Sequence, residues 1–230
     1  MIRLENLSKG FATPDGGRKI LFRDVTLEIP SGVSVALLGR NGAGKSTLMD
    51  MIGGTVRPDS GRIVTTGTVS WPVGFAGSFH RDMTGLQNTR FVARIYGVDT
   101  DELVAFVEDF AELGPHFNAP VRSYSSGMRS RLAFGISIGI PFDTYLVDEV
   151  TAVGDAAFRM KSGAIFQERM KTAGAIFVSH AMPQVRRLCQ AGAVLEGGRL
   201  TYFDDIEAAI AQHQKNMGVD AGDEDDEDDG

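Results

Sequence analysis

The chain has 230 residues, of which 43% are apolar, and its 23 basic and 30 acidic side chains give a formal net charge of −7. Apolar content of this size can bury a sizeable core, which excludes a wholly disordered chain. The longest nearly apolar run, residues 132–142, is far shorter than the roughly 20 residues of a membrane-spanning helix, and the single Cys189 excludes an intrachain disulfide. Since no leader pattern opens the sequence, we expect the chain to stay in the cytosol and not to cross a bilayer by itself.

The acidity lies in one segment. Residues 220–230 contain eight acids and no base, so residues 1–219, with 22 acids and 23 bases, are close to neutral. Like charges at this density repel one another, so we expect residues 218–230 to be a solvated, disordered tail. Regulation or partner binding by this tail is the alternative. Residues 1–217 are expected to form the folded domain.

Short aliphatic and β-branched runs alternate with helical patterns along the folded domain. Strands alternating with helices predict an α/β fold with a mostly parallel sheet. Thr84 and Thr100 are suitable N-caps, and Pro183 suits a first helical turn. Gly97 and Gly114 suit the residue that follows a helix. The expected strands are residues 3–7, 25–29, 33–38, 62–65, 144–147, 175–178 and 193–196, and the expected helices are residues 45–51, 85–96, 101–113, 126–138, 156–171, 183–188 and 204–216.

Two regions depart from simple alternation. The first two strands and the turn segment Pro14-Asp15-Gly16-Gly17 come before any helix, which predicts an antiparallel β subdomain. Residues 74–123 contain helices and loops without a convincing strand. Together with the helix that follows, they predict a helical lobe of about residues 74–139, inserted between two halves of the sheet.

A glycine-rich segment joins the apolar strand at residues 33–38 to the next helix. It matches the G-x-x-x-x-G-K-[ST] pattern of P-loop NTPases, in the strand and helix context that this pattern requires. Glycines let backbone amides point at phosphate oxygens, at a helix N-terminus that favours an anion. Lys45 is expected to reach the β- and γ-phosphates, and Ser46 to bind Mg²⁺. The predicted ATP-binding segment consists of Gly39, Arg40, Asn41, Gly42, Ala43, Gly44, Lys45, Ser46 and Thr47.

Two acids, Asp148 and Glu149, follow the apolar strand at residues 144–147. A strand that ends in an acid delivers a carboxylate to the carboxyl edge of a parallel sheet, beside the phosphate loop. Asp148 is expected to hold Mg²⁺ through its water shell. Glu149 is expected to act as the general base that polarises the attacking water. The alternative is that the two acids only supply negative charge at a helix N-terminus.

Between these motifs stands Tyr124-Ser125-Ser126-Gly127-Met128, which resembles the signature motif of ATP-binding cassette (ABC) ATPases. Other matches occur in the family's order, and together they cover residues 1 to about 200. His180 matches the switch histidine and Asp155 the D-loop acid. Phe11 matches the aromatic residue that stacks on adenine. The sequence is therefore similar to the nucleotide-binding domains of ABC transporters.

The resemblance implies an ABC-type fold and a homodimer in which two copies sandwich two ATP molecules. Ser125, Ser126 and Gly127 would face the ATP of the partner subunit. Lys45, Glu149 and His180 would be the catalytic residues, with ATP and Mg²⁺ bound. Without the resemblance, Ser125 could be an ordinary N-cap, Phe11 a small core residue, and His180 a polar residue at the sheet edge.

The subfamily is indicated by a departure from the usual pattern. The family's glutamine between the phosphate loop and the lobe is absent, since no Gln occurs in residues 70–86. This segment, with its Ser70-Trp71-Pro72 element, looks like the ATPase subunits of polysaccharide exporters, and most like the capsular branch. Trp71 would pack against a transmembrane partner or inside the lobe.

The polysaccharide exporter resemblance implies a separate transmembrane permease, polysaccharide cargo handled indirectly, and a peripheral position on the cytoplasmic face of the inner membrane. No nucleic acid partner is expected. O-antigen or teichoic-acid export is the alternative, and the missing carbohydrate-binding domain of some O-antigen subunits favours capsule. A soluble non-transport ABC ATPase or a regulatory module without catalysis fits less well, because the catalytic residues are present and no second cassette follows.

Overall fold

The computed structural model describes residues 1–14, 16–74, 77, 79–148, 155–179 and 181–218. Within this part of the chain, six strands form the core sheet in the order β5-β6-β7-β3-β8-β9, and every neighbouring pair is parallel except β8 and β9. The mostly parallel α/β sheet predicted from the alternating pattern is confirmed. The core strands are β3 (Ser34–Leu38), β5 (Val69–Pro72), β6 (Thr144–Asp148), β7 (Gly174–Val178), β8 (Ala191–Glu196) and β9 (Arg199–Phe203).

A smaller sheet is antiparallel, as the early turn segment predicted. Its strand order is β2-β1-β4. Its strands are β1 (Ile2–Ala12), β2 (Arg18–Ile29) and β4 (Ser60–Thr65). The first two strands extend well beyond the expected residues 3–7 and 25–29. The outer halves of these strands are polar and are stabilised by cross-strand pairing, from Lys9↔Phe22 to Ala12↔Arg18. Strand formation there therefore does not require a local apolar pattern.

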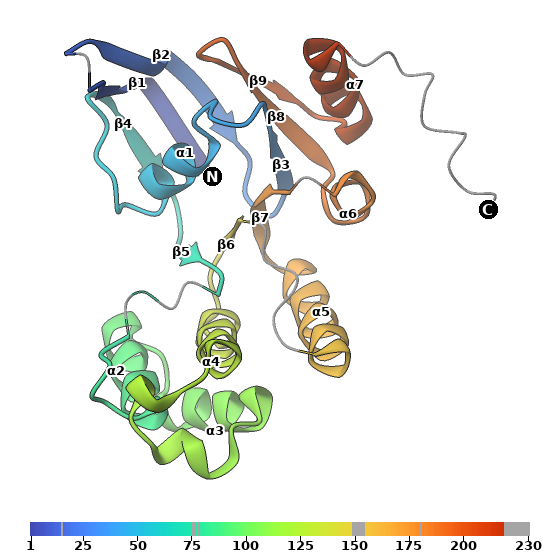
Figure 1. Ribbon diagram of the computed structural model, residues 1–230. Helices are drawn as coiled ribbons and strands as arrows, with labels where there is room; N and C mark the ends of the chain where they lie inside the picture. The colour runs from blue at the N-terminus through green and yellow to red at the C-terminus, as the bar shows by residue number, and fades with distance from the viewer. Residues whose placement is uncertain (15, 75–76, 78, 149–154, 180, 219–230) are drawn as a thin grey trace, which may run out of the picture.

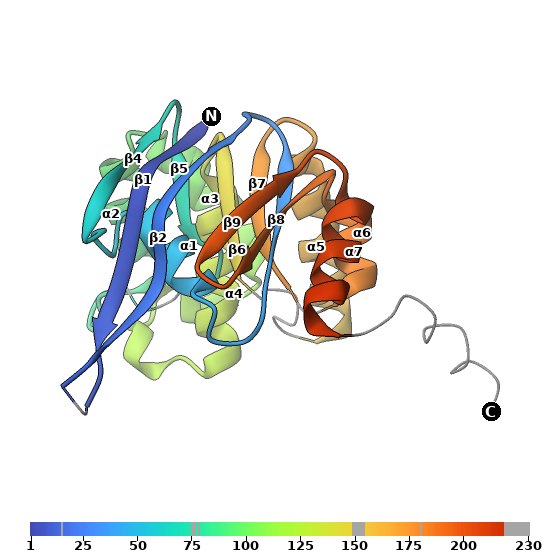
Figure 2. The same ribbon diagram turned by 90° about the horizontal axis from the view of Figure 1, so that it is seen from above.

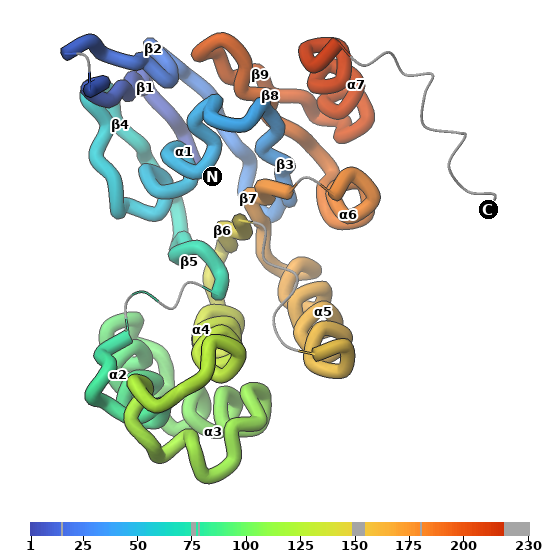
Figure 3. Tube along the Cα trace, in the orientation of Figure 1, coloured from blue at the N-terminus to red at the C-terminus, as the bar shows by residue number. Residues whose placement is uncertain are grey.

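The helices fall into two groups. Helices α2 (Gly85–Tyr96), α3 (Thr100–Ala111) and α4 (Ser126–Gly139) lie together at the end of the molecule away from the antiparallel strands (Figure 1). In Figure 3 the chain enters this group after β5 and returns from α4 to β6, so the helical lobe is inserted between neighbouring strands. The other helices are α1 (Lys45–Ile52), α5 (Ala156–Met170), α6 (Met182–Leu188) and α7 (Ile206–Met217), besides short 3₁₀ turns at Gly114–Asn118 and Val121–Ser123.

The central strand β3 separates two apolar layers. Its side chains alternate, so that Val35 and Leu37 face one buried cluster while Ala36 and Leu38 face another. The first cluster joins α1 to the antiparallel sheet, and the second joins the core sheet to the lobe and to α5, α6 and α7. Figure 2 shows β1 and β2 on one side of the core strands and α6 and α7 on the other. None of the described helices combines the length and apolar character needed to cross a membrane.

Several helix ends match their predictions. Thr84 caps α2 in a capping box, in which Thr84 Oγ1 accepts from Gln87 N at 3.0 Å and Gln87 Oε1 accepts from Thr84 N at 2.9 Å. Gly97 follows α2 with a left-handed φ of 65°. Pro183 lies in the first turn of α6. Each of these signals is local, and each is confirmed.

The ends predicted for α3 are wrong. Asp99 rather than Thr100 is the N-cap, because its Oδ1 accepts from the backbone N–H of both Asp101 and Glu102 at 2.9 Å. The helix ends at Ala111, its C-cap Glu112 adopts the left-handed φ of 53°, and Gly114 begins the following 3₁₀ turn. An aspartate can accept two N–H donors at once, which makes it the better cap of the two neighbouring candidates.

Strands β5 and β9 were not predicted. β5 has four residues and includes Pro72, so its sequence does not resemble a strand. In the sheet, β5 is an edge strand that pairs with β6. β9 pairs with β8 through a turn at Gly197-Gly198, whose φ angles of 56° and 77° suit a tight hairpin. That Gly-Gly pair was a usable hairpin signal.

We predict that Tyr145→Phe lowers the free energy of unfolding by about 1–2 kcal/mol, because a buried hydrogen-bonded hydroxyl is lost. Tyr145 is fully buried, and its hydroxyl donates to Ile140 O at 2.7 Å and accepts from Phe142 N at 3.3 Å. These bonds fix the turn that leads from α4 into β6. Urea unfolding measures the change, with Tyr96→Phe on the half-exposed Tyr96 as the control. Equal stability of Tyr145→Phe and the wild type would contradict this account.

Candidate functional site

The glycine-rich segment forms a tight loop between the end of β3 at Leu38 and the start of α1 at Lys45. Gly42 and Gly44 have φ angles of 76° and 110°, in the region that side chains with a Cβ rarely adopt. Gly39 has a φ of 154°, and in addition a Cβ there would lie 2.4 Å from the carbonyl oxygen of Leu195 on β8. The loop thus adopts the conformation that lets backbone amides face an anion.

Lys45 begins α1 and is only 9% exposed. Its Nζ donates to the carbonyl oxygens of Gly39 at 2.5 Å and of Arg40 at 3.1 Å, so the ammonium group lies across the mouth of the loop. A nearly buried cation is costly unless negative groups compensate it. The loop carbonyls supply part of that compensation.

A cleft of about 560 Å³ opens beside this loop. It brings together Phe11 from β1, the phosphate loop and Asp148 at the end of β6, the residues for which an adenine contact, a phosphate site and a metal ligand were predicted. Ser46 and Asp148 supply the oxygen donors that Mg²⁺ prefers, so the donor set fits this ion. The cleft is lined by Phe11, Lys19, Leu21, Asn41, Gly42, Gly44, Lys45, Ser46, Thr47, Asp148 and Val178.

Lys19 and Leu21 of β2 are cleft residues that the sequence analysis missed. Lys19 is the cross-strand partner of Phe11, and its Nζ is 3.9 Å from the position of a Cβ at Gly42. An ammonium group in this position adds positive charge to the phosphate end of the cleft. Extending the predicted hairpin outward from its turn segment would have placed Lys19 opposite Phe11.

Other residues of the predicted segment lie around the cleft. Arg40 is exposed, and its Nη1 donates to Asn216 O near the end of α7 at 3.5 Å. Ala43 closes the loop by donating its backbone N–H to Arg40 O at 3.1 Å. Neither residue lines the cleft with its neighbours.

The predicted signature residues lie elsewhere. Ser125 is the N-cap of α4, with its Oγ accepting from Met128 N at 3.2 Å, while its proposed contact with a partner's ATP stays a prediction. An added Cβ at Gly127 would meet no atom closer than 3.9 Å. Ser125 and Gly127 line a separate depression of about 280 Å³, together with Glu112, Leu113, His116, Met128 and Arg131.

Asp155 is the N-cap of α5. Its Oδ1 accepts from Phe158 N at 2.9 Å and its Oδ2 accepts from Arg131 Nη2 at 2.8 Å. The Phe158 N–H, followed by the charge of Arg131, lowers the pKa of the Asp155 carboxyl group. Arg131 belongs to α4, so this acid ties α5 to the helix that Ser125 begins.

Two predicted catalytic residues, Glu149 and His180, lie outside the described residues. Their neighbours are placed. Asp148 ends β6 and pairs with Val178 at the end of β7, so the two strands finish side by side at the cleft. Ser179 Oγ accepts from Ala181 N at 3.1 Å.

Trp71 packs within the chain. Its ring centroid lies 5.0 Å from that of Tyr96 and 5.5 Å from that of Phe142, which favours the lobe-packing alternative over a partner contact. Gln87, the first glutamine after the phosphate loop, is used in the capping box of α2.

Comparisons with known proteins agree on one family. The profile described as "ABC transporter" matches residues 22–152. A polysialic acid transport ATP-binding protein, KpsT of Escherichia coli, is 48% identical over 96% of this chain and 99% of its own length. A capsule polysaccharide export ATP-binding protein, CtrD of Neisseria meningitidis serogroup B, is 44% identical over 91% of this chain and 96% of its own. An O-antigen export system ATP-binding protein, RfbB of Klebsiella pneumoniae, is 35% identical over 87% of this chain and 84% of its own length.

A solved structure has the same fold. It is a dimeric ATP-binding cassette in a post-hydrolysis state, bound to ADP and Pi, with a TM-score of 0.72. The match covers 88% of this chain and 97% of that chain at 19% identity. At this identity the likeness establishes the fold alone.

We predict that Gly39→Ala lowers the free energy of unfolding by about 3 kcal/mol, because the new methyl group clashes with a strand carbonyl. Gly42→Ala is the matched control, since the nearest atom to its new Cβ is 3.9 Å away and only the φ of 76° opposes it. It should lose about 1–2 kcal/mol. Denaturant titration compares both variants with the wild type, and equal losses would contradict the close approach of Gly39 to β8.

Proposed function

Because the chain belongs to the ABC transporter family, we propose that it binds and hydrolyses ATP in the cleft beside the phosphate loop and thereby powers export of a capsular polysaccharide. The observation that carries this proposal is the single cleft that gathers Phe11, Lys45, Ser46 and Asp148. An aromatic ring, a cation and two oxygen ligands match the base, the phosphates and the metal of a nucleotide. The ATPase domain is proposed to comprise residues 1–217, with the helical lobe at about residues 74–139.

At the phosphate end, the amides of the Gly39 to Thr47 loop and the ammonium of Lys45 bind the phosphate oxygens. Lys45 exchanges its bonds to the Gly39 and Arg40 carbonyls for bonds to the β- and γ-phosphates. A Mg²⁺ ion, held by Ser46 and through water by Asp148, would neutralise charge on the phosphate oxygens. At the other end, Phe11, which is 47% exposed, stacks on the adenine.

Hydrolysis requires a base next to the γ-phosphate. Glu149 follows Asp148 directly in the sequence, and it is proposed to take a proton from the water that attacks the γ-phosphorus. The bond from that phosphorus to the β,γ-bridging oxygen breaks, and ADP and phosphate leave. His180 donates a hydrogen bond to the γ-phosphate as charge develops there.

The depression at Ser125 and Gly127 is proposed to complete the cleft of a second copy. The residues of this depression do not line the chain's own cleft. A nucleotide bound in that cleft would therefore not contact the depression of the same molecule. In a homodimer, Ser125, Ser126 and Gly127 of each subunit face the γ-phosphate held by the other. Asp155, at the start of α5, is proposed to act as the D-loop acid of this dimer.

The cargo and the partners follow from the relatives. The relatives named for polysialic acid transport and capsule polysaccharide export are 48% and 44% identical, while the one named for O-antigen export is 35% identical. We therefore propose a separate transmembrane permease, and a peripheral position of this chain on the cytoplasmic face of the inner membrane. O-antigen or teichoic-acid export is the second candidate, which the O-antigen relative keeps open.

We expect a Lys45→Ala substitution in the host's own gene to abolish surface capsule and to retain the polysaccharide inside the cell, because Lys45 binds the transferred phosphate. Glu149→Gln should give the same defect while the purified chain still binds ATP. Fractionated cells probed for capsule and for O-antigen or teichoic acid provide the measurement. Normal capsule with loss of either other polymer would transfer the assignment to the second candidate.

A mixing experiment tests the shared sites. Alone, Lys45→Ala loses phosphate binding, and Ser125→Arg blocks the partner's γ-phosphate, so both variants should be inactive. Mixed in equal amounts, they form dimers in which one site keeps Lys45 and Ser125 intact, so about a quarter of wild-type ATPase activity should return. Purified-protein ATPase assays measure this, with each variant alone at the same total concentration as the control. No recovery on mixing, with mixed dimers present, would contradict the shared site.

A further inference from the structure

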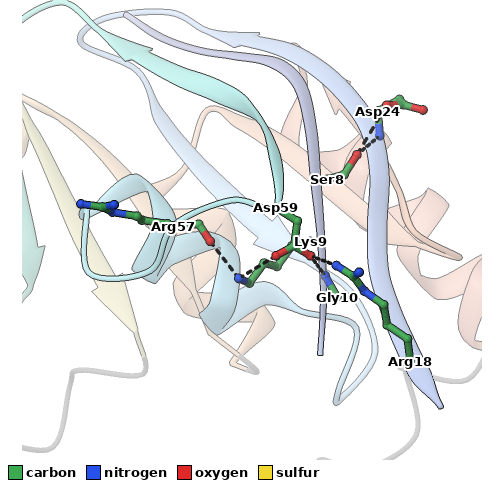
Figure 4. Close-up of polar contacts among 7 residues, drawn as sticks. All are labelled: Ser8, Lys9, Gly10, Arg18, Asp24, Arg57 and Asp59. Atoms are coloured by element: carbon green, nitrogen blue, oxygen red, sulfur yellow. Dashed lines mark hydrogen bonds and ion pairs between the residues drawn. The ribbon is translucent and has the colours of Figure 1, made fainter. Parts of the chain in front are cut away.

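Asp59 contacts the strand that carries Phe11 at the point where the pairing of β1 with β4 stops, while the pairing of β1 with β2 continues to Ala12↔Arg18. The last β1–β4 pair is Ser8↔Ser60, and Phe11 lies three residues beyond it. Beyond this pair, Asp59 forms the hydrogen bonds to β1: its N–H donates to Ser8 O at 3.0 Å, and its Oδ2 accepts from Gly10 N at 2.8 Å. Figure 4 shows this carboxylate at the centre of contacts with Lys9, Gly10 and Arg18.

The same carboxylate joins both strands of the hairpin. Its Oδ1 accepts from Lys9 Nζ at 3.2 Å, and its Oδ2 accepts from Arg18 Nη2 of β2 at 2.5 Å. The Gly10 N–H and the Lys9 ammonium lower the pKa of the Asp59 carboxyl group, so it is ionised at neutral pH. Gly10 must be small, since a Cβ there would lie 2.8 Å from Lys19 O.

Lys9 connects this network to the ring of Phe11. Its Nζ lies 5.2 Å from the Phe11 ring centroid, within the range of a cation–π contact. The Lys9 side chain is only 12% exposed, so its ammonium is held by defined partners. Those partners are Asp59 and Arg57 O, which accepts from Nζ at 2.8 Å (Figure 4).

The network also reaches the phosphate loop through the chain. Arg57 and Asp59 belong to the segment that follows α1, and α1 begins with Lys45. That segment is fixed to α1, because Thr55 N and Val56 N both donate to Asp50 O, at 2.9 and 3.2 Å. Asp59 therefore ties the Phe11 end of β1 to the segment that follows α1, in addition to the pairing of Phe11 with Lys19 on β2.

We propose that Asp59 is a positioning residue that holds Phe11 at the spacing required by a base attached to a triphosphate, and so makes the cleft select nucleotides over plain polyphosphates. This inference rests on the proposed function, since it assumes that Phe11 stacks on the base. Asp59 touches neither ligand; it acts through Lys9 and Gly10. Its removal should therefore affect binding of the base and leave binding of the phosphates unchanged.

The test measures binding of ATP and of inorganic tripolyphosphate, each with Mg²⁺, by calorimetry on the full chain. Asp59→Ala should weaken ATP binding about tenfold, the size of one lost base–aromatic stack, and change tripolyphosphate binding less than about twofold. Phe11→Ala should show the same selective loss. The double variant should bind ATP no more weakly than Phe11→Ala alone, because both changes remove one interaction.

Glu5→Ala is the matched control. It also removes an ion pair between β1 and β4, the 2.6 Å contact of Glu5 Oε2 with Arg62 Nε, but in the half of the sheet away from Phe11. It should bind both ligands like the wild type. If Asp59→Ala fails to fold, Asp59→Asn replaces it with the same expected selectivity, because its amide oxygen still accepts from the Gly10 N–H while the attraction to Lys9 and Arg18 is lost.

Three results would overturn the inference: unchanged ATP binding by Asp59→Ala, equal weakening of both ligands, or additive losses in the double variant. Equal weakening would mean that Asp59 supports the phosphate loop or the whole sheet. The proposed function fails separately, if the wild-type chain binds neither ligand. A wild-type chain that binds both, with an Asp59→Ala variant that changes neither, contradicts only the role of Asp59.

Discussion

Lys45 is only 9% exposed, and its ammonium group contacts the carbonyl oxygens of Gly39 and Arg40. A cation in this place constrains its surroundings, since the low local dielectric strengthens its attraction to a phosphate and also raises the cost of leaving it uncompensated. The loop must bend tightly enough to bring its carbonyls and amides around one point. That bend depends on Gly39 lying directly against β8, so the phosphate site and the core sheet are built as one unit.

The layering of the sheet decides which groups can reach that point. Because the side chains of β3 alternate between two apolar clusters, the central strand is covered on both faces and only its carboxyl end is open to a ligand. β6 and β7 finish at the same edge, which brings Asp148 into the cleft. The antiparallel sheet packs on the α1 side and adds Phe11 and Lys19 from a hairpin. The lobe, inserted between β5 and β6, carries Ser125 to a different depression.

The sequence predicted what depends on neighbours along the chain. The phosphate loop, the Thr84 cap and the acid at the end of β6 each follow from a few consecutive residues, and the structure places them as expected. Lys19 and Asp59 could not be found this way, because their roles depend on pairing of β1 with β2 and on the return of the chain to β1 some 50 residues later. Asp99 was overlooked because two adequate caps are adjacent. The roles of Glu149 and His180 stay predictions, since both lie outside the described residues.

Arg131 connects the helix that begins at the predicted signature segment with Asp155, the predicted D-loop acid. On α4, one turn after Gly127, its guanidinium lies 4.4 Å from the centroid of the Phe158 ring and bonds Asp155 Oδ2, while Glu112 Oε2 lies 3.8 Å from its Nη1. Arg131 is only 20% exposed, so it is a better-defined contact than most surface pairs. A shift of α5 would therefore be transmitted through Asp155 and Arg131 to the helix that Ser125 begins.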